Sequence, residues 1–321
     1  MRRVWLFAVI LGTGAGLTTF LVLLARPPAA PPLPKPNGYD DFLAAAAAWK
    51  GHIDDANPRD PAALRALVAT NAQTLRCLRR GLDREFCLPF AITNMSSISV
   101  LVQLLAAEGM AAGLDHRFLA AARCYDTAIR FGNQISRGGP FNNRLVGISC
   151  ETIGCNGLVQ LMPKLTFAED RVVLAELEQI DQTHVRWEDV VRNQRRLVPI
   201  SLGKGLHPLR WAAAWRQVWK EDRRIETDHQ IIVAHERLIA TELALRCFRS
   251  DRGHAPGRLE ELVAAYLPQI PQDPFSGQTL IYRPTGANWL LYSVGPDGVD
   301  HGGKPAPRAS RQGDVFFDSP W

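Results

Sequence analysis

The sequence predicts a mainly α-helical protein that has an N-terminal transmembrane helix, a body of helical hairpins and a small C-terminal α+β module with an antiparallel sheet. Three observations lead to this prediction: residues 4–25 are uncharged, apolar residues recur at helical spacing over 40–249, and two short runs with the pattern of a hairpin stand at 280–284 and 289–294. With 321 residues, of which 46% are hydrophobic and 21% are charged, the chain has enough apolar material for one or two packed domains.

The uncharged run at 4–25 predicts a membrane anchor. At about 1.5 Å per helical residue it is long enough to cross a hydrocarbon core of about 30 Å. Arg2 and Arg3 precede it and Arg26 follows, which favours a cytoplasmic N-terminus. The alternative is a cleaved signal peptide, but the run exceeds the usual roughly 7–15 apolar residues of such a peptide, and no Ala-x-Ala site follows. We therefore expect residues 4–25 to bind the inner membrane as a single span.

A proline-rich segment follows the anchor and marks a domain boundary. Its composition is typical of an extended polyproline spacer, which rises about 3.1 Å per residue. The predicted organisation is therefore an anchor over 1–26, a linker over 27–37, a helical domain over 38–225 and a C-terminal module over 226–321.

Capping residues predict where several helices of the body begin. Asp60 is an N-cap before a proline at the first helical position, and apolar spacing then continues over 61–81. Asp115 is the candidate cap of the next clear helix, and Thr166 with Glu169 forms a capping box before another. Because strand patterns are scarce in this part of the sequence, we expect an antiparallel helical array.

The segment 105–131 allows comparison with a tetratricopeptide unit. Gly109, Ala121, Tyr125 and Ala128 occupy positions where that repeat has small and aromatic packing residues. A second copy at a period of about 34 residues is missing from the sequence, and stacked repeats need neighbours to bury their faces. A simple helical hairpin is therefore the preferred interpretation.

The end of the chain carries the most specific pattern. A long helix is predicted over 226–249 and is followed by Gly253-His254-Ala255-Pro256, Asp273-Pro274-Phe275-Ser276-Gly277, the hairpin, Gly295-Pro296-Asp297-Gly298-Val299-Asp300-His301-Gly302-Gly303 and Gly313-Asp314-Val315. From near Ile239 onward this order resembles the globular end of the major pseudopilins of type II secretion. The rest of the chain resembles membrane-anchored helical proteins of bacteria.

The pseudopilin resemblance implies a periplasmic, non-enzymatic module that binds calcium. It places calcium on Asp297 and Asp314, and we add Asp300 because calcium takes several oxygen ligands. The basic segment 304–308 and Arg311 stand where the family commonly has acidic residues, and positive charge lowers the affinity for a cation. The alternative is a glycine-rich turn in which the aspartates cap their own backbone.

Polar residues on the predicted long helix and tryptophans before it suggest two further sites, a metal site and a membrane-interface stripe, each with a structural alternative. His229 and His235 are six apart, whereas a zinc helix of the His-Glu-x-x-His kind needs a spacing of four. For these two histidines, and for Asp228 and Glu236, polar contacts at the surface or between helices are therefore preferred to a metal site. Tryptophans at steps of four suit either a bilayer interface or, as we prefer, the core; these are Trp211, Trp215 and Trp219.

The six cysteines offer no Cys-x-x-Cys pair, and their disulfide pairing cannot be assigned from spacing. Cys124 and Cys247 on predicted helices are expected to be small buried residues.

Motifs of common enzymes are missing from the sequence. It has neither a Gly-x-Ser-x-Gly elbow nor a phosphate-binding loop. The net charge of +5 is spread along the chain, so a nucleic-acid partner is not expected. We expect a membrane-tethered structural or interaction protein of the bacterial envelope, linked to type II secretion or pilus-like systems, whose body lies in the periplasm and binds other envelope proteins. The alternative is an envelope hydrolase with an active site in the helical body.

Overall fold

The structure is a computed structural model that describes residues 32–51, 60–89, 95–201, 208–286, 288–305 and 312–319, with the backbone alone over 197–201 and 208–221. The predicted anchor at 4–25 lies outside the described residues, as does the first part of the predicted linker.

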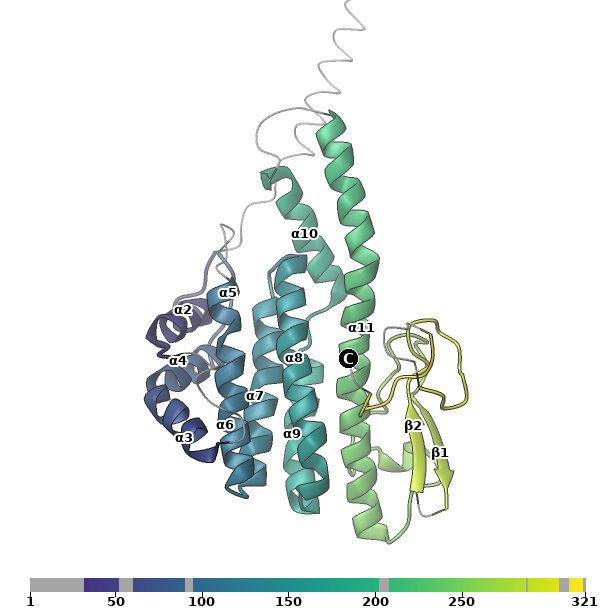
Figure 1. The fold of residues 1–321 in the computed structure, drawn as a ribbon. Coiled ribbons are helices and arrows are strands. Elements are labelled where there is room, and N and C mark those ends of the chain that lie inside the picture. Colours follow the sequence, from purple (N-terminus) through teal and green to yellow (C-terminus); the bar gives the residue numbers. More distant parts are fainter. Residues whose placement is uncertain are drawn as a thin grey trace, which may run out of the picture.

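The described residues are mainly helical, with one small antiparallel sheet near the C-terminus (Figure 1). The α-helices are α2 (Gly38–Ala48), α3 (Pro61–Thr70), α4 (Ala72–Leu82), α5 (Met95–Ser99), α6 (Leu101–Leu114), α7 (Phe118–Ser136), α8 (Phe141–Leu161), α9 (Phe167–Gln182), α10 (Trp187–Ser201) and α11 (Pro208–Arg252). Two short 3₁₀ helices are η2 (Met162–Lys164) and η3 (Leu259–Leu262), and the strands are β1 (Ile281–Thr285) and β2 (Asn288–Tyr292).

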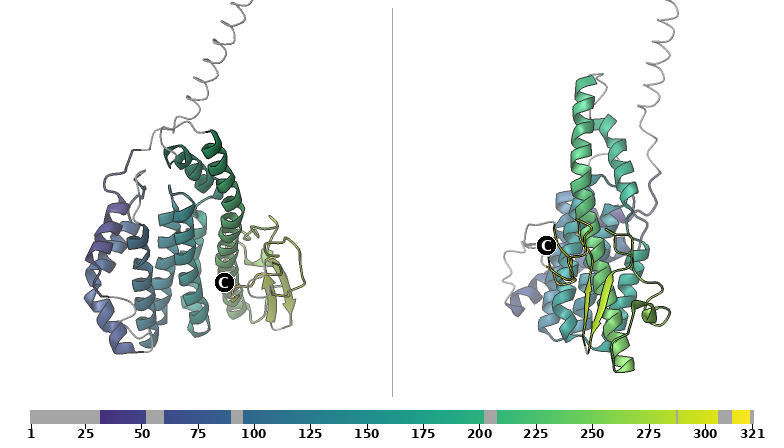
Figure 2. Two further views of the ribbon diagram at one scale, coloured as in Figure 1. Left: turned by 45° about the horizontal axis from the view of Figure 1, so that its top comes forward. Right: turned by 90° about the vertical axis from the view of Figure 1, so that its right-hand side faces the viewer.

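The helices form an array in which neighbours in sequence are largely neighbours in space. Figure 1 shows the array running from α2, α3 and α4 at one edge, through α6, α7, α8 and α9, to α11 at the other. The sheet lies on the outer side of α11, and α10 projects with the first part of α11 beyond the other helices (Figures 1 and 2). This arrangement confirms the predicted helical body.

The core is divided between two large apolar clusters, and α7 contributes to both. Tyr125 and Ile129 belong to the cluster shared with α8, α9 and α11, whereas Phe131 and Ile135 belong to the cluster shared with α2, α4 and α6. Two adjacent faces of one helix therefore join the two halves of the body.

Helices α7 and α8 approach closely because glycines face each other across their contact. A side chain at Gly132 would overlap the carbonyl oxygen of Gly147, and a side chain at Gly147 would overlap Ser136. The close approach brings the polar face of α8 against the end of α7, which positions the site described below.

The C-terminal module packs directly on α11. Strands β1 and β2 pair in register with Ile281 opposite Tyr292, which confirms the predicted hairpin. Apolar residues of the module join the same core cluster as α11, namely Leu259, Leu262, Leu267, Leu280, Leu291 and Val315. The long predicted helix is confirmed and begins earlier, so residue 226 lies within α11.

Two of the predicted caps are confirmed. The side chain of Asp60 accepts a hydrogen bond from the Ala62 N–H at 2.9 Å. Thr166 and Glu169 form the capping box of α9, in which the Thr166 N–H donates to the Glu169 carboxylate at 2.8 Å.

Two local predictions are wrong. The helix expected over 61–81 is divided at Asn71, because its side chain accepts from the Lys50 N–H at 2.8 Å and donates to the Lys50 carbonyl at 2.9 Å. Asp115 does not cap α7; its carboxylate instead accepts hydrogen bonds from the side chains of Arg65 and Arg117.

Helices α6 and α7 form the predicted hairpin. A side chain at Gly109 would lie 2.9 Å from the ring of Tyr125, so the glycine allows the two helices to pack on that ring.

All six cysteines lie in the described residues and are free thiols, with Cys124 and Cys247 buried as expected. The tryptophan stripe of 211–219 lies on α11, but its side chains are outside the described ones.

By length and composition, two stretches among the described helices are apolar enough to cross a membrane. They are Met95–Leu114 and Phe141–Lys164, and half of each is buried inside the body. Such burial is typical of helices in a protein core. The predicted anchor at 4–25 is not one of these two stretches and stays a prediction.

Candidate functional site

A fully buried ion pair lies at the centre of the helical body. Arg144 and Glu151 are seven residues apart on one face of α8, and both side chains are inaccessible to solvent. Two guanidinium N–H groups of Arg144 donate to the two carboxylate oxygens of Glu151, at 2.7 and 2.8 Å. Such bidentate pairing holds a carboxylate in one orientation.

Arg144 also connects α8 to two other helices. Its Nε–H donates to Nδ1 of His229 on α11 at 3.0 Å, and an Nη1–H donates to the Ser136 hydroxyl on α7 at 3.1 Å. Nδ1 of His229 therefore carries a lone pair, which fixes the tautomer of that imidazole. Burial and the neighbouring Arg144 charge lower the pKa of His229 to about 2, so its ring is neutral at pH 7.

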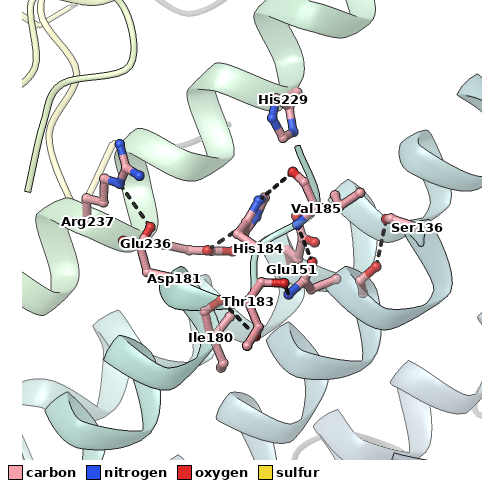
Figure 3. A network of polar contacts seen from close by, with 12 residues as sticks. Ser136, Glu151, Ile180, Asp181, Thr183, His184, Val185, His229, Glu236 and Arg237 are labelled. Carbon is pink, nitrogen blue, oxygen red and sulfur yellow. Dashed lines mark hydrogen bonds and ion pairs between the residues drawn. The ribbon is translucent and has the colours of Figure 1, made fainter. Parts of the chain in front are cut away.

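His184 lies in the turn between α9 and α10 and points into the same centre. Its Nδ1–H donates to the Val185 carbonyl oxygen at 3.1 Å, which leaves a lone pair on Nε2. Asn133 of α7 holds this turn by donating to the Thr183 carbonyl at 3.2 Å and accepting from the Val185 N–H at 2.8 Å. Figure 3 shows His184 between Val185 and Glu236, with His229 beside it.

Glu236 of α11 completes the cluster. Its carboxyl oxygens are buried and have no hydrogen-bond donor among the described residues, although Nε2 of His184 is 3.6 Å from Oε2. Burial, followed by the charge of Glu151, raises the pKa of Glu236 well above its usual value, and burial lowers the pKa of His184 to about 3. The contact is therefore between a neutral imidazole and a protonated carboxyl, rather than an ion pair.

Three side chains of this centre have the spacing of metal ligands. Glu151, His184 and Glu236 each offer one ligand atom, and these atoms lie within 4.8 Å of one another. In the part of the chain that the structure describes, this is the one such group of three.

Cavities lie on two sides of the cluster. An open cleft of about 840 Å³ is lined by His184, His229, Trp187 and Arg137, among others. A smaller cavity of about 290 Å³, bordered by α9, α11 and the segment 267–271, is lined by Glu236. Of the three potential ligands, His184 therefore borders a solvent-connected cleft and Glu236 borders a second cavity, whereas Glu151 lines neither.

A larger groove of about 1500 Å³ runs along α7, with α3, α4 and α6 on one side and α9 on the other. Arg123 and Arg130 lie seven residues apart on the face of α7 that lines it, and Arg137, the C-cap residue of α7, follows after seven more and also lines it. The arginines in its lining outnumber the acidic residues: Arg65, Arg79, Arg84, Arg117, Arg123, Arg130 and Arg137, against Glu85, Glu108, Asp126, Glu169 and Glu176.

Several groove arginines already form hydrogen bonds or ion pairs within the chain, but their side chains remain about half exposed. Arg123 donates to Glu176 at 3.1 Å, and Arg130 donates to the Leu82 carbonyl oxygen at 2.7 Å. Burial, followed by the neighbouring Glu176 carboxyl, raises the pKa of Asp126 well above its usual value, which favours the uncharged acid. Arginine is consequently the main charged residue of the groove lining, and Asp41, Asp83 and Asp115 beside the lining pair with Arg84, Arg130 and Arg65.

The predicted calcium residues are close together in the C-terminal loop, where each accepts hydrogen bonds from the chain. The buried carboxylate of Asp314 accepts three backbone N–H groups, from His301 at 3.1 Å, Gly303 at 2.7 Å and Lys304 at 3.1 Å. This is the backbone capping expected of a glycine-rich turn.

The other two aspartates behave in the same way. Asp297 accepts from the backbone of Val299 at 3.2 Å and from that of Gly313 at 3.1 Å. Asp300 accepts from the Gly302 N–H and from the Tyr292 hydroxyl, both at 2.7 Å. Calcium binding by the three aspartates stays a prediction.

On α11, the preference for polar contacts between elements is supported. His229 accepts from Arg144 of α8, and Nε2 of His235 donates to the Phe317 carbonyl oxygen. His229 and Glu236, which share a face at seven residues, both reach the buried centre.

Sequence reasoning missed Arg144, Glu151 and His184. The available signal was the pair Arg144 and Glu151, two charges seven residues apart in a helix that is otherwise apolar or small on that face. Such a face normally packs against a neighbour, so two charges on it indicate a buried ion pair.

Comparisons of the chain with protein-family models, with curated proteins and with solved structures give no match.

Proposed function

We propose that this chain is a membrane-tethered, non-enzymatic interaction protein of the bacterial envelope, and that the groove along α7 binds an extended acidic segment of another envelope protein. The observation that carries this proposal is the row of Arg123, Arg130 and Arg137 in an arginine-lined groove of about 1500 Å³. The anchor at 4–25 and the pseudopilin resemblance of the C-terminal module support a periplasmic body linked to type II secretion or pilus-like systems.

The spacing of the arginines suits an extended ligand. Residues seven apart on a helix are separated by about 10.5 Å along its axis, which is close to the length of three extended residues. Carboxylates at every third position of an extended segment would therefore meet successive arginines. Since exposed ion pairs stabilise a protein little, Arg123 can exchange Glu176 for a ligand carboxylate at small cost.

Site-specific photocrosslinking of the full-length chain in its native membrane tests the proposal. A photoreactive residue replaces Thr127, which lines the groove, or Ser149, which is exposed on α8 and does not line it. We expect one protein adduct from position 127 and none from position 149. An adduct of equal yield at both positions, or none at 127, would reject groove binding.

Charge reversal sharpens this experiment. Arg123→Glu combined with Arg130→Glu is expected to lower the adduct yield at least tenfold. The matched control is Arg76→Glu with Arg258→Glu, which changes the net charge equally at exposed residues outside the groove lining. The same loss in the control would mean that overall charge, and not the groove, determines binding.

A second candidate, an envelope hydrolase with its active site in the helical body, is favoured by one observation. Glu151, His184 and Glu236 converge from distant positions, and His184 also lines an open cleft. Such a convergence of titratable groups beside a cleft is typical of active sites. Turnover of ester, phosphate or amide substrates that is lost in His184→Ala would support this candidate, and equal turnover by the variant would reject it.

A further inference from the structure

The buried cluster contains polar atoms that have no hydrogen-bond partner within the described residues and could bind a ligand. Glu236 places two carboxyl oxygens in the protein interior without a hydrogen-bond donor among the described residues. Buried polar groups normally have a partner, so an unpaired buried carboxyl indicates a bound group. The lone pair on Nε2 of His184 faces the same oxygens at 3.6 Å.

We propose that Glu151, His184 and Glu236 bind a divalent transition-metal ion of the zinc class. Their ligand atoms lie within 4.8 Å of one another, whereas ligands about 2.1 Å from a tetrahedral ion lie about 3.4 Å apart. Side-chain movement of about 1 Å is therefore enough to close the three ligands round an ion.

The groups around the ligands are arranged as supports for metal ligation. A ligating histidine usually donates its other ring N–H to an oxygen, and Nδ1 of His184 does so to the Val185 carbonyl at 3.1 Å. Arg144 holds Glu151 by two hydrogen bonds, and each carboxylate oxygen keeps a second lone pair for an ion. Arg144 is in this sense a positioning residue.

The ligand set selects the class of ion. An imidazole nitrogen suits zinc, iron or nickel, whereas calcium and magnesium prefer oxygen ligands alone. Glu151 and Arg144 cancel in charge while Glu236 is protonated. An ion that displaces the Glu236 proton meets two ionised carboxylates, which with Arg144 sum to −1 and favour a divalent cation. Three protein ligands leave a fourth tetrahedral position for water, and the cleft lined by His184 provides a route to solvent.

This inference goes beyond the proposed interaction function and does not depend on it. The test uses the full-length chain in detergent, stripped with a chelator and then titrated with Zn²⁺ alone in a calorimeter. We expect one tight site per chain and a higher melting temperature with Zn²⁺, because an ion that binds only the folded state stabilises it. Absence of stoichiometric binding or of a melting shift in the wild-type chain would overturn the proposal.

Isosteric variants locate the ion. Glu236→Gln keeps the shape of the side chain but weakens ligation, and we expect at least a tenfold loss of Zn²⁺ affinity. The matched control is Glu178→Gln, since Glu178 lines the same small cavity and is not among the three ligands. Equal affinity in both variants would assign the zinc to other residues and contradict the site.

Discussion

The C-terminal aspartate loop and the buried helical cluster present acidic groups in opposite ways. In the loop, Asp314 is satisfied by three backbone N–H groups that lie within 13 residues of it. In the cluster, Glu236 has no donor among the described residues, and its neighbours come from positions 151 and 184. A local run of glycines and aspartates can therefore use its carboxylates to shape the loop, whereas carboxyls that converge from distant helices are left for a ligand.

The strongest test of this comparison is the removal of Arg144. Arg144→Met leaves the buried Glu151 carboxylate without its partner, and breaking a buried pair in this way costs about 3–5 kcal/mol. The free energy of unfolding from denaturant titration measures the cost. The control Arg186→Met breaks an exposed pair with Asp189, for which about 0–1 kcal/mol is expected. Equal costs in the two variants would contradict the importance of the buried centre.

Acid should destabilise the cluster before it affects the loop. Burial depresses the pKa values of His184 and His229 to about 3 and about 2, so their stabilising contribution is complete above the unfolded pKa near 6.5. It is lost as the pH falls from about 6.5 toward those values, at up to about 1.4 kcal/mol per pH unit for each histidine. The raised pKa of Glu236 offsets part of this loss, because the folded chain already holds that proton, but two histidines outweigh one carboxyl.

The loop should respond only at lower pH. Hydrogen bonds from Tyr292 and Gly302 lower the pKa of Asp300, so its contribution is present above the unfolded value of about 3.9 and is lost below it. Hydrogen exchange of the segments 181–190 and 297–305, followed by mass spectrometry from pH 7 to pH 2.5, measures both regions. Faster exchange in the loop at a higher pH than in the cluster would reverse the expected order.

Removal of Asp314 measures how much the loop depends on backbone capping. Asp314→Ala leaves three buried or partly buried N–H groups without their acceptor and should cost about 2 kcal/mol. Thermal unfolding at fixed calcium concentration measures this effect, with Glu260→Ala at an exposed position as control. A loss no larger than that of the control would show that the backbone contacts of Asp314 contribute little.

Calcium should produce the smallest effect. The sequence predicts that Asp297, Asp300 and Asp314 bind calcium, and an ion that binds only the folded state must raise the melting temperature. Melting curves of the full chain with calcium and with a chelator, compared with those of Asp297→Ala, measure this. An unchanged melting temperature would reject calcium binding and leave backbone capping as the role of the three aspartates.

The features that the sequence predicts correctly are those with causes close together in the chain. Asp60 caps the helix that follows it by accepting from an N–H two residues ahead, and Thr166 forms a capping box with Glu169, three residues ahead. The break at Asn71 could not be predicted, because it depends on hydrogen bonds to Lys50, 21 residues away in the sequence.

The buried centre depends on contacts that are still more distant in sequence. His229 is 85 residues from Arg144, and only the packing of α8 against α11 brings them within hydrogen-bonding distance. The spacing of Arg144 and Glu151 on one helix face indicates a buried pair, but nothing near it in the sequence identifies His184 as its neighbour. The candidate site could therefore be identified from the fold but not from the sequence alone.

Anomalous X-ray diffraction at the zinc edge, from crystals of the full chain grown with stoichiometric Zn²⁺, tests the difference between the two regions most directly. The account predicts one strong peak among the side chains of Glu151, His184 and Glu236. A peak confined to Asp297, Asp300 and Asp314, or no peak at the helical centre, would contradict it.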